Sequence, residues 1–166
     1  MKHSSPTPKR FTLDAPPALP LRPYLEETTT ISVRFNEVDA LRIVWHGHYA
    51  NYFEEARRAF GRRYSVDYAM FLKHNVAVPV VQLHLDYFAP ACLSDVLEIS
   101  ARLFKSEAAK LLFAYEVRRQ GEATVLATGS TVQVFTTPAG KLLLTWPSFM
   151  VERLKAWEPL WKHTSP

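Results

Sequence analysis

One amphipathic helix, followed by a run of strands, constrains the fold of this chain more than any other feature. Aromatic and small apolar residues recur at spacings of three and four from Tyr49 to Tyr64, which places them on one face of a helix of about 16 residues. Glutamates and arginines occupy the opposite face, where Glu54 and Arg58 lie four residues apart as a favourable ion pair. Such a helix must bury its aromatic face against another layer of structure.

The segments on both sides of this helix have the alternation and β-branched content of strands. One strand is expected from Thr29 to Phe35, before the helix, and residues 66–74 predict a short second helix after it. Further strands are expected at 78–88, 95–104, 110–119, 124–136 and 141–146, and a closing helix is expected with Ser148 as its N-cap. Consecutive strands favour antiparallel hairpins, so we predict an α+β fold with one long helix against a sheet. The other face of that sheet would need cover, which favours an oligomer.

The prolines are concentrated at the N-terminus, with six of the twelve in the first 23 residues. Proline lacks a backbone donor and disfavours helix in the residue before it. Residues 1–27 are therefore predicted to form an extended or partly disordered arm, and residues 28–166 to form a single domain. The chain length of 166 residues fits one domain with a sizeable core.

Composition excludes several classes of protein. A single cysteine, Cys92, allows neither an internal disulfide nor a cysteine-built zinc site, and we interpret it as inert. His84 and Asp86 share one strand face, but two ligands are too few for a metal site, so no metal is predicted. No apolar run approaches the roughly 18 residues of a membrane span, and no secretory signal is recognisable, so we expect a cytoplasmic protein. The net charge of +4 favours an acidic partner, although glutamates interrupt the basic helix face and no nucleic acid is expected.

Residues 36–49 carry the groups that point to chemistry. Asp39, His46, Gly47 and His48 fall just before the predicted helix, whose first backbone N–H groups and positive dipole end could hold a developing oxyanion. A carboxylate nearby could attack a carbonyl or activate a water molecule. The spacing alone leaves a second interpretation open, in which Asp39 is a turn former and the two histidines only cap the helix.

The same segment resembles the signature of 4-hydroxybenzoyl-CoA thioesterase-type hotdog proteins. The resemblance is carried by Asp39, the Ile-Val-Trp-His run at 43–46 and the Tyr-x-x-Tyr-Phe-Glu-Glu-Ala-Arg string at 49–57. Later matching pieces are Asp86-Tyr87, Pro90, Asp95 and Ala127-Thr128-Gly129. It extends from about residue 29 to residue 155 and implies a curved antiparallel sheet wrapped around a central helix. It also implies hydrolysis of an acyl thioester by a homodimer or homotetramer, with the active site between two subunits.

The resemblance implies a role for individual residues. Asp39 would be the catalytic carboxylate, as nucleophile or general base, and the backbone N–H of His46, with Gly47, would polarise the thioester carbonyl. Substrate-contact candidates are Arg42, His48, Tyr49, Tyr52 and Glu54. Candidates for the coenzyme A phosphates are Lys105 and Lys110. One departure stands out, because the family commonly has glycine where this chain has Arg42.

The expected function is therefore hydrolysis of acyl thioesters of coenzyme A or of acyl carrier protein. No cofactor is predicted, since coenzyme A would enter as part of the substrate. The alternative is a non-catalytic module that binds acyl groups or docks an acidic acyl carrier protein, with the helix arginines as its surface. Release of a thiol from acyl thioesters separates the two hypotheses.

Overall fold

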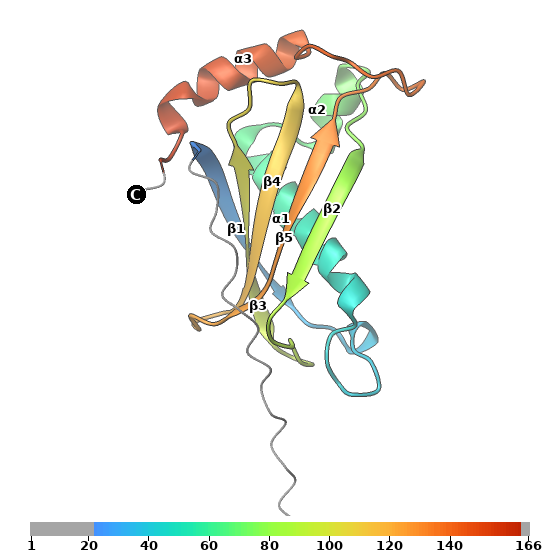
Figure 1. Ribbon diagram of the computed structural model, residues 1–166, viewed down its shortest axis with the longest axis vertical. Helices are drawn as coiled ribbons and strands as arrows, with labels where there is room; N and C mark the ends of the chain where they lie inside the picture. The colour runs from blue at the N-terminus through green and yellow to red at the C-terminus, as the bar shows by residue number, and fades with distance from the viewer. Residues whose placement is uncertain (1–21, 164–166) are drawn as a thin grey trace, which may run out of the picture.

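A five-stranded antiparallel sheet forms the body of the computed structural model, which describes residues 22–163 (Figure 1). The strand order is β1-β3-β4-β5-β2, so β1 and β2 lie at the two edges. The strands are β1 (Tyr24–Ser32), β2 (Val80–Tyr87), β3 (Val96–Phe104), β4 (Lys110–Arg119) and β5 (Val125–Val134). The α-helices are α1 (Tyr49–Tyr64), α2 (Tyr68–Lys73) and α3 (Ser148–Trp157). Short 3₁₀ turns are η1 (Phe35–Glu37), η2 (His46–His48) and η3 (Glu158–Leu160).

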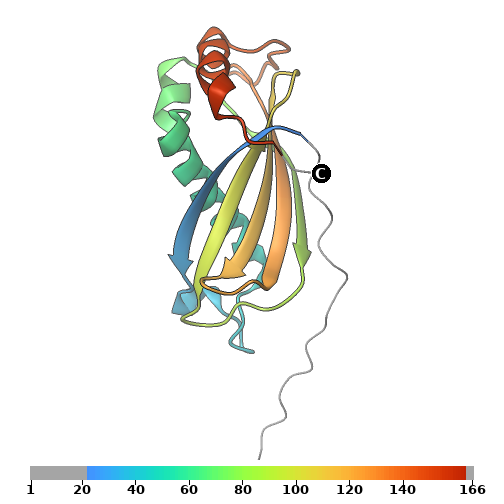
Figure 2. The ribbon, with the colours of Figure 1, turned by 90° about the vertical axis from the view of Figure 1, so that its left-hand side faces the viewer.

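The long helix α1 packs its aromatic face on the sheet, as its periodicity predicts. Figure 2 shows α1 and α2 on one side of the sheet, while α3 covers one end of it. The Phe53 ring stacks on the Tyr115 ring with 4.4 Å between centroids, and the Phe60 ring meets Phe113 edge-on at 5.1 Å. Gly129 permits this approach, because a Cβ there would lie 2.3 Å from the Phe53 ring. The predicted α+β hotdog architecture, a curved antiparallel sheet around one long helix, is confirmed.

The first strand begins earlier than its sequence pattern indicates. β1 starts at Tyr24, so residues 24–27, which were predicted to belong to the arm, pair with β3 instead. The physical reason is that Leu25 is fully buried, while Glu26 pairs with Arg102 across the two strands at 2.6 Å. Pairing thus begins directly after the last proline of the cluster, Pro23. The arm prediction for residues 1–21 lies outside the described residues.

The segment after β5 also differs from its prediction. Residues 141–146 form no strand, and only Leu142 makes an isolated bridge, to Thr136. The next place in the sheet beside β5 is already taken by β2, so this segment has no strand to pair with. Pro147, not Ser148, holds the N-cap position of α3, and Asp67 caps α2 by accepting the Met70 N–H at 3.0 Å. Among the helices of residues 22–163, none is both long and apolar enough to cross a membrane.

Candidate active site

Asp39 opens a tight turn between η1 and α1. Its backbone N–H donates to the Ile43 carbonyl at 2.9 Å, and its carbonyl accepts the Arg42 N–H at 2.9 Å. Its side-chain Oδ1 accepts the Leu41 N–H at 2.8 Å, which is the usual role of aspartate at the first position of a turn. The other carboxylate oxygen, Oδ2, has no hydrogen-bond partner within residues 22–163. Asp39 therefore forms the turn and still presents one free oxygen.

Arg42 occupies the last position of this turn with φ of 62°. A turn of this kind, followed by a bulge, places its last residue in the left-handed region, where glycine is favoured because it has no Cβ. Glycine, which the family resemblance implies at this place, would adopt this conformation without strain. The arginine adopts the same backbone conformation at a cost in strain, and its side chain is exposed.

The backbone N–H groups of His46 and Gly47 lie at the start of one continuous helical segment, because η2 runs directly into α1. N–H groups in the first turn of a helix have no intrahelical acceptor, so both can bind an anionic ligand. The Trp45 indole lies against Gly47, where an added Cβ would come within 2.0 Å of the ring. The His46 carbonyl accepts the Tyr87 hydroxyl at 2.9 Å. These contacts fix the position of the helix start.

A buried glutamate, Glu37, connects the turn to the helix, and no motif in the sequence pointed to this role. Its Oε2 accepts the Arg34 N–H at 2.8 Å and the Tyr52 hydroxyl at 3.0 Å, and its backbone carbonyl accepts the Trp45 N–H at 2.9 Å. Burial, with the Glu37 carboxylate beside it, raises the pKa of Tyr52, so its hydroxyl stays protonated and donates. Glu37 thus holds the helix and the segment before it in one arrangement.

The loop between β2 and β3 supports the turn from the other side. The Ala91 carbonyl accepts the Val44 N–H at 2.8 Å, and the Ala91 N–H donates to the Tyr49 hydroxyl at 3.3 Å. Asp95 fixes this loop by accepting the Cys92 N–H at 2.8 Å and Arg119 Nε at 2.7 Å. Burial alone would lower the pKa of Arg119, but its hydrogen bond to Asp95 and the charge of that carboxylate raise it.

The substrate-contact candidates have different places in the structure. Tyr49 and Tyr52 are only 3% and 2% exposed, so they support the site from within the core and leave little ring surface for a substrate. His48 is half-buried, with Nδ1 3.4 Å from the Asn51 amide nitrogen. Glu54 lies two turns further along α1, where it pairs with Arg57.

The two lysines proposed for the coenzyme A phosphates are not brought to this site within one chain. Lys105 and Lys110 flank the turn between β3 and β4, which lies beside α3, at the end of the sheet opposite the segment that joins β1 to α1 (Figure 1). Lys105 Nζ also pairs with Glu158 at 2.8 Å. Among residues 22–163, no three side chains of the His, Cys, Asp and Glu types cluster as metal ligands, and His84 pairs with Asp86 alone at 3.0 Å.

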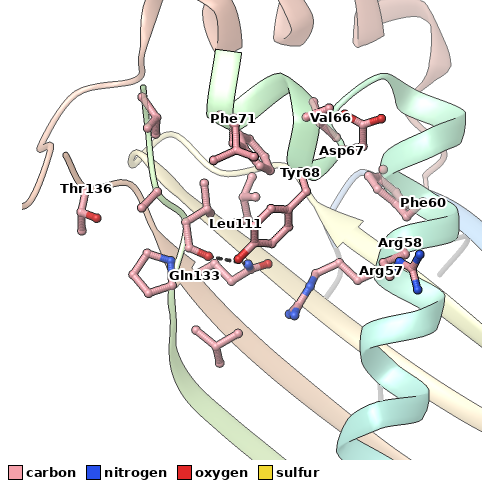
Figure 3. A pocket seen from close by; sticks show the side chains of 18 of the residues that line it. Arg57, Arg58, Phe60, Val66, Asp67, Tyr68, Phe71, Leu111, Gln133 and Thr136 are labelled. Atoms are coloured by element: carbon pink, nitrogen blue, oxygen red, sulfur yellow. Dashed lines mark hydrogen bonds between the residues drawn. The ribbon is translucent and has the colours of Figure 1, made fainter. Parts of the chain in front are cut away.

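A cavity of about 1090 Å³ lies beside the second half of α1, between that helix, α2 and the sheet (Figure 3). Apolar surface predominates in its walls, with Phe60, Phe71 and Leu111 among them. The lining also includes charged and polar residues: Glu54, Arg57, Arg58, Arg62, Asp67, Asn75, Gln133, Thr136 and Thr137. The first lining residue on α1, Glu54, is about 12 Å beyond His46 along the helix axis. No pattern in the sequence predicted this cavity.

Comparison with known proteins decides the family. The model of the thioesterase-like superfamily matches residues 33–154. The chain belongs to this superfamily. Acyl-CoA thioester hydrolase YbgC of Escherichia coli O157:H7 is 26% identical over 125 residues, covering 75% of this chain and 92% of the relative. Long-chain acyl-CoA thioesterase FadM of Escherichia coli K12 is 30% identical over 99 residues, covering 60% of this chain and 74% of the relative.

Solved structures of the superfamily share the fold. The hypothetical protein TT1821 from Thermus thermophilus has a TM-score of 0.70 and 33% identity, covering 80% of this chain and 97% of that one. A 4-hydroxybenzoyl CoA thioesterase in complex with 4-hydroxybenzoyl CoA has a TM-score of 0.68 and 17% identity, covering 77% of this chain and 97% of that one. The resemblance stated from the sequence motifs is confirmed by these matches.

Proposed function

We propose that this protein hydrolyses acyl thioesters of coenzyme A with Asp39 and the start of α1. The observation that carries the proposal is the pairing of a carboxylate in a fixed turn with N–H groups at a helix start that is anchored on both sides. The names of the relatives, acyl-CoA thioester hydrolase and long-chain acyl-CoA thioesterase, support the same reaction.

The helix start supplies electrostatic stabilisation in this mechanism. The thioester carbonyl oxygen binds the His46 N–H, with the Gly47 N–H beside it, and the positive end of the helix stabilises the negative charge that develops there. A thioester is already an activated acyl donor, so a carboxylate and an oxyanion site suffice, without a Ser-His-Asp triad.

Asp39 supplies the carboxylate by one of two routes. As nucleophile, its oxygen forms a bond to the carbonyl carbon and the C–S bond breaks, after which water cleaves the mixed anhydride and the thiolate takes a proton. As general base, it removes a proton from a water molecule whose oxygen attacks the carbonyl carbon, and the thiol leaves with that proton. In both routes the Leu41 N–H holds one carboxylate oxygen and leaves the other for chemistry.

A second copy of the chain completes the site in this proposal. β2 is an edge strand with Val81, Leu83 and Tyr87 exposed along it, and Tyr87 lies beside the helix start. An exposed apolar edge is a typical place for strand pairing between subunits. We therefore propose a homodimer through β2, which could assemble further into a tetramer, in a cytoplasmic protein.

A hydrolysis assay tests the proposal and separates the two possible carriers. The protein is mixed with acyl thioesters of coenzyme A and of acyl carrier protein, across several acyl groups, and thiol release is followed with a thiol reagent. Saturable thiol release from at least one coenzyme A thioester is expected. Thiol release only from carrier-protein thioesters would identify acyl carrier protein, and not coenzyme A, as the carrier of the acyl group. Saturable binding with no thiol released from any thioester would instead identify an acyl-binding module.

A further inference from the structure

We propose that the cavity beside α1 receives the far end of a long acyl chain, and that Gln133 favours chains with a hydroxyl group at that end. This inference rests on the proposed thioesterase function, because it names the acyl group on which that site acts. It assigns a specificity role to a residue outside the turn and the helix start.

The position of the cavity sets the length of the acyl group. Arg57, which lines the cavity, is about 16 Å beyond His46 along α1. Gln133 lies six residues along β5 from Ala127, which pairs with Tyr87 beside His46, and this separation is about 20 Å. An acyl group with a single aromatic ring would end well before either residue, whereas a long chain reaches both.

One face of β2 leads from the helix start to the cavity. Leu85 pairs with Gly129, which faces the Phe53 ring of α1, so Leu83 and Tyr87 lie on the same face by strand alternation. Tyr87 contacts the His46 carbonyl at one end of this row, and Val80 lines the cavity at the other. The row provides apolar surface for the methylene groups between the thioester and the chain end.

Gln133 is the group inside the cavity that needs a partner. It is only 6% exposed, and its Nε2 donates to the Val78 carbonyl at 2.9 Å. That bond fixes the amide orientation and leaves Oε1 buried with no donor among the described residues. Buried carbonyl oxygens without a donor are rare, because the loss of hydration is not compensated. Oε1 has less than 1 Å² of exposed surface, so a ligand hydroxyl that displaces the side chains covering it would satisfy this atom.

The neighbouring charges favour an uncharged donor. Figure 3 shows the Arg57 side chain reaching from α1 toward the Gln133 amide, and Arg57 is paired with Glu54. Arg58 and Arg62 also line the cavity, but Arg58 pairs with Glu55, and Asp67 adds a negative charge to the same lining. Because Glu54 already pairs with Arg57, a carboxylate at the chain end would gain little there and would face the unpartnered Gln133 oxygen. A hydroxyl group donates its proton to Gln133 Oε1 and accepts from a guanidinium N–H.

The wild-type protein provides the first test. Values of kcat/KM are measured for hexadecanoyl-CoA, ω-hydroxyhexadecanoyl-CoA and 3-hydroxyhexadecanoyl-CoA. A roughly tenfold preference for the ω-hydroxy chain over the plain chain is expected, since satisfying one buried acceptor has that magnitude. The 3-hydroxy chain, with its hydroxyl near the thioester, should show no such preference. Equal values for all three would overturn the inference.

Two variants link the preference to Gln133. Gln133→Met keeps the length of the side chain and removes the amide, so the ω-hydroxy preference should fall to about onefold. Gln120→Met makes the same change at an exposed position outside the cavity and should retain the tenfold preference. An unchanged tenfold preference for the ω-hydroxy chain in folded Gln133→Met would overturn the role of Gln133. If that variant does not fold, the comparison of substrates with the wild-type protein still tests the inference.

Measurements of acyl-thioester binding test this inference independently of the proposed hydrolysis. Calorimetry with the Asp39→Asn variant measures the affinity for the same three thioesters without turnover. Tighter binding of the ω-hydroxy chain by roughly tenfold supports the cavity even if no thioester is hydrolysed. Equal affinity for the plain and ω-hydroxy chains contradicts it, whether or not the wild-type protein releases thiol.

Discussion

The two ends of α1 are built in opposite ways. At its start, exposed polar groups are held by hydrogen bonds between a tight turn, a buried glutamate and the loop that contains Ala91. Beside its second half, a partly open cavity of about 1090 Å³ has mainly aromatic and aliphatic walls. In the proposed function, the hydrogen-bonded end carries out the bond-breaking chemistry and the apolar end selects the acyl group, so changes at the two ends should have separate effects.

Replacing Gly129 by alanine should affect both ends of α1 together, because both depend on the contact between α1 and the sheet. The new Cβ would lie 2.3 Å from the Phe53 ring and 2.7 Å from the His84 backbone carbonyl, which cannot move aside easily. Overpacking of this kind costs about 3 kcal/mol of unfolding free energy, measurable by urea denaturation. Ser130→Ala, at the next, exposed position of the strand, is the control. Equal stability of the two variants would contradict the packing described for α1.

Tyr52→Phe should damage only the start of the helix. The change removes the hydrogen bond to Glu37, so the free energy of unfolding should fall by about 1–2 kcal/mol. Thioester turnover should fall as well, while the preference for the ω-hydroxy chain persists. Tyr64→Phe is the matched control, because Tyr64 donates a hydrogen bond to the Glu26 carbonyl from the other end of α1. A loss of turnover in Tyr64→Phe equal to that in Tyr52→Phe would contradict the division between the two ends.

Arg42→Gly should produce the smallest change in stability, and in the opposite direction. Glycine relieves the backbone strain at the left-handed position of the turn, but it also gives the unfolded chain more conformational freedom. The net result should be a gain of about 0.5–1 kcal/mol in the free energy of unfolding. Ser65→Gly should give a similar gain, because Ser65 ends α1 with φ of 57°. Thermal unfolding measures both. A rise in KM for acyl-CoA in Arg42→Gly alone would assign the guanidinium to substrate binding, and destabilisation by Arg42→Gly would contradict the strain at the turn.

Local patterns in the sequence predicted the long helix and the turn before it. The aromatic spacing from Tyr49 to Tyr64 reports directly on which face of a helix is buried, and the structure has α1 at those residues. The missing glycine at Arg42 pointed to a turn position whose positive φ the structure shows. Both signals lie within a few consecutive residues, so no long-range pairing was needed to recognise them.

Features that depend on distant contacts were not predictable in this way. Residues 24–27 join the sheet because β3 pairs with them. The proline-rich sequence before them had instead predicted that they belong to an extended arm. Glu37 looks like an ordinary loop residue until Tyr52 and the Arg34 N–H are seen to contact it. Gln133 sits in a strand pattern that does not reveal its orientation toward a cavity, although an inward-facing glutamine among small residues is a usable signal once the register is known.

The Asp39→Asn variant tests whether Asp39 supplies the catalytic carboxylate. Because Asp39 also forms the turn, the substitution must keep the turn intact. Alanine would remove both roles, whereas asparagine keeps an oxygen that accepts the Leu41 N–H and loses only the carboxylate. If Asp39 supplies the carboxylate, kcat for the best acyl-CoA substrate should fall roughly thousandfold, with the melting temperature and the Kd for that substrate unchanged. Turnover at the wild-type rate by this variant would contradict this role of Asp39.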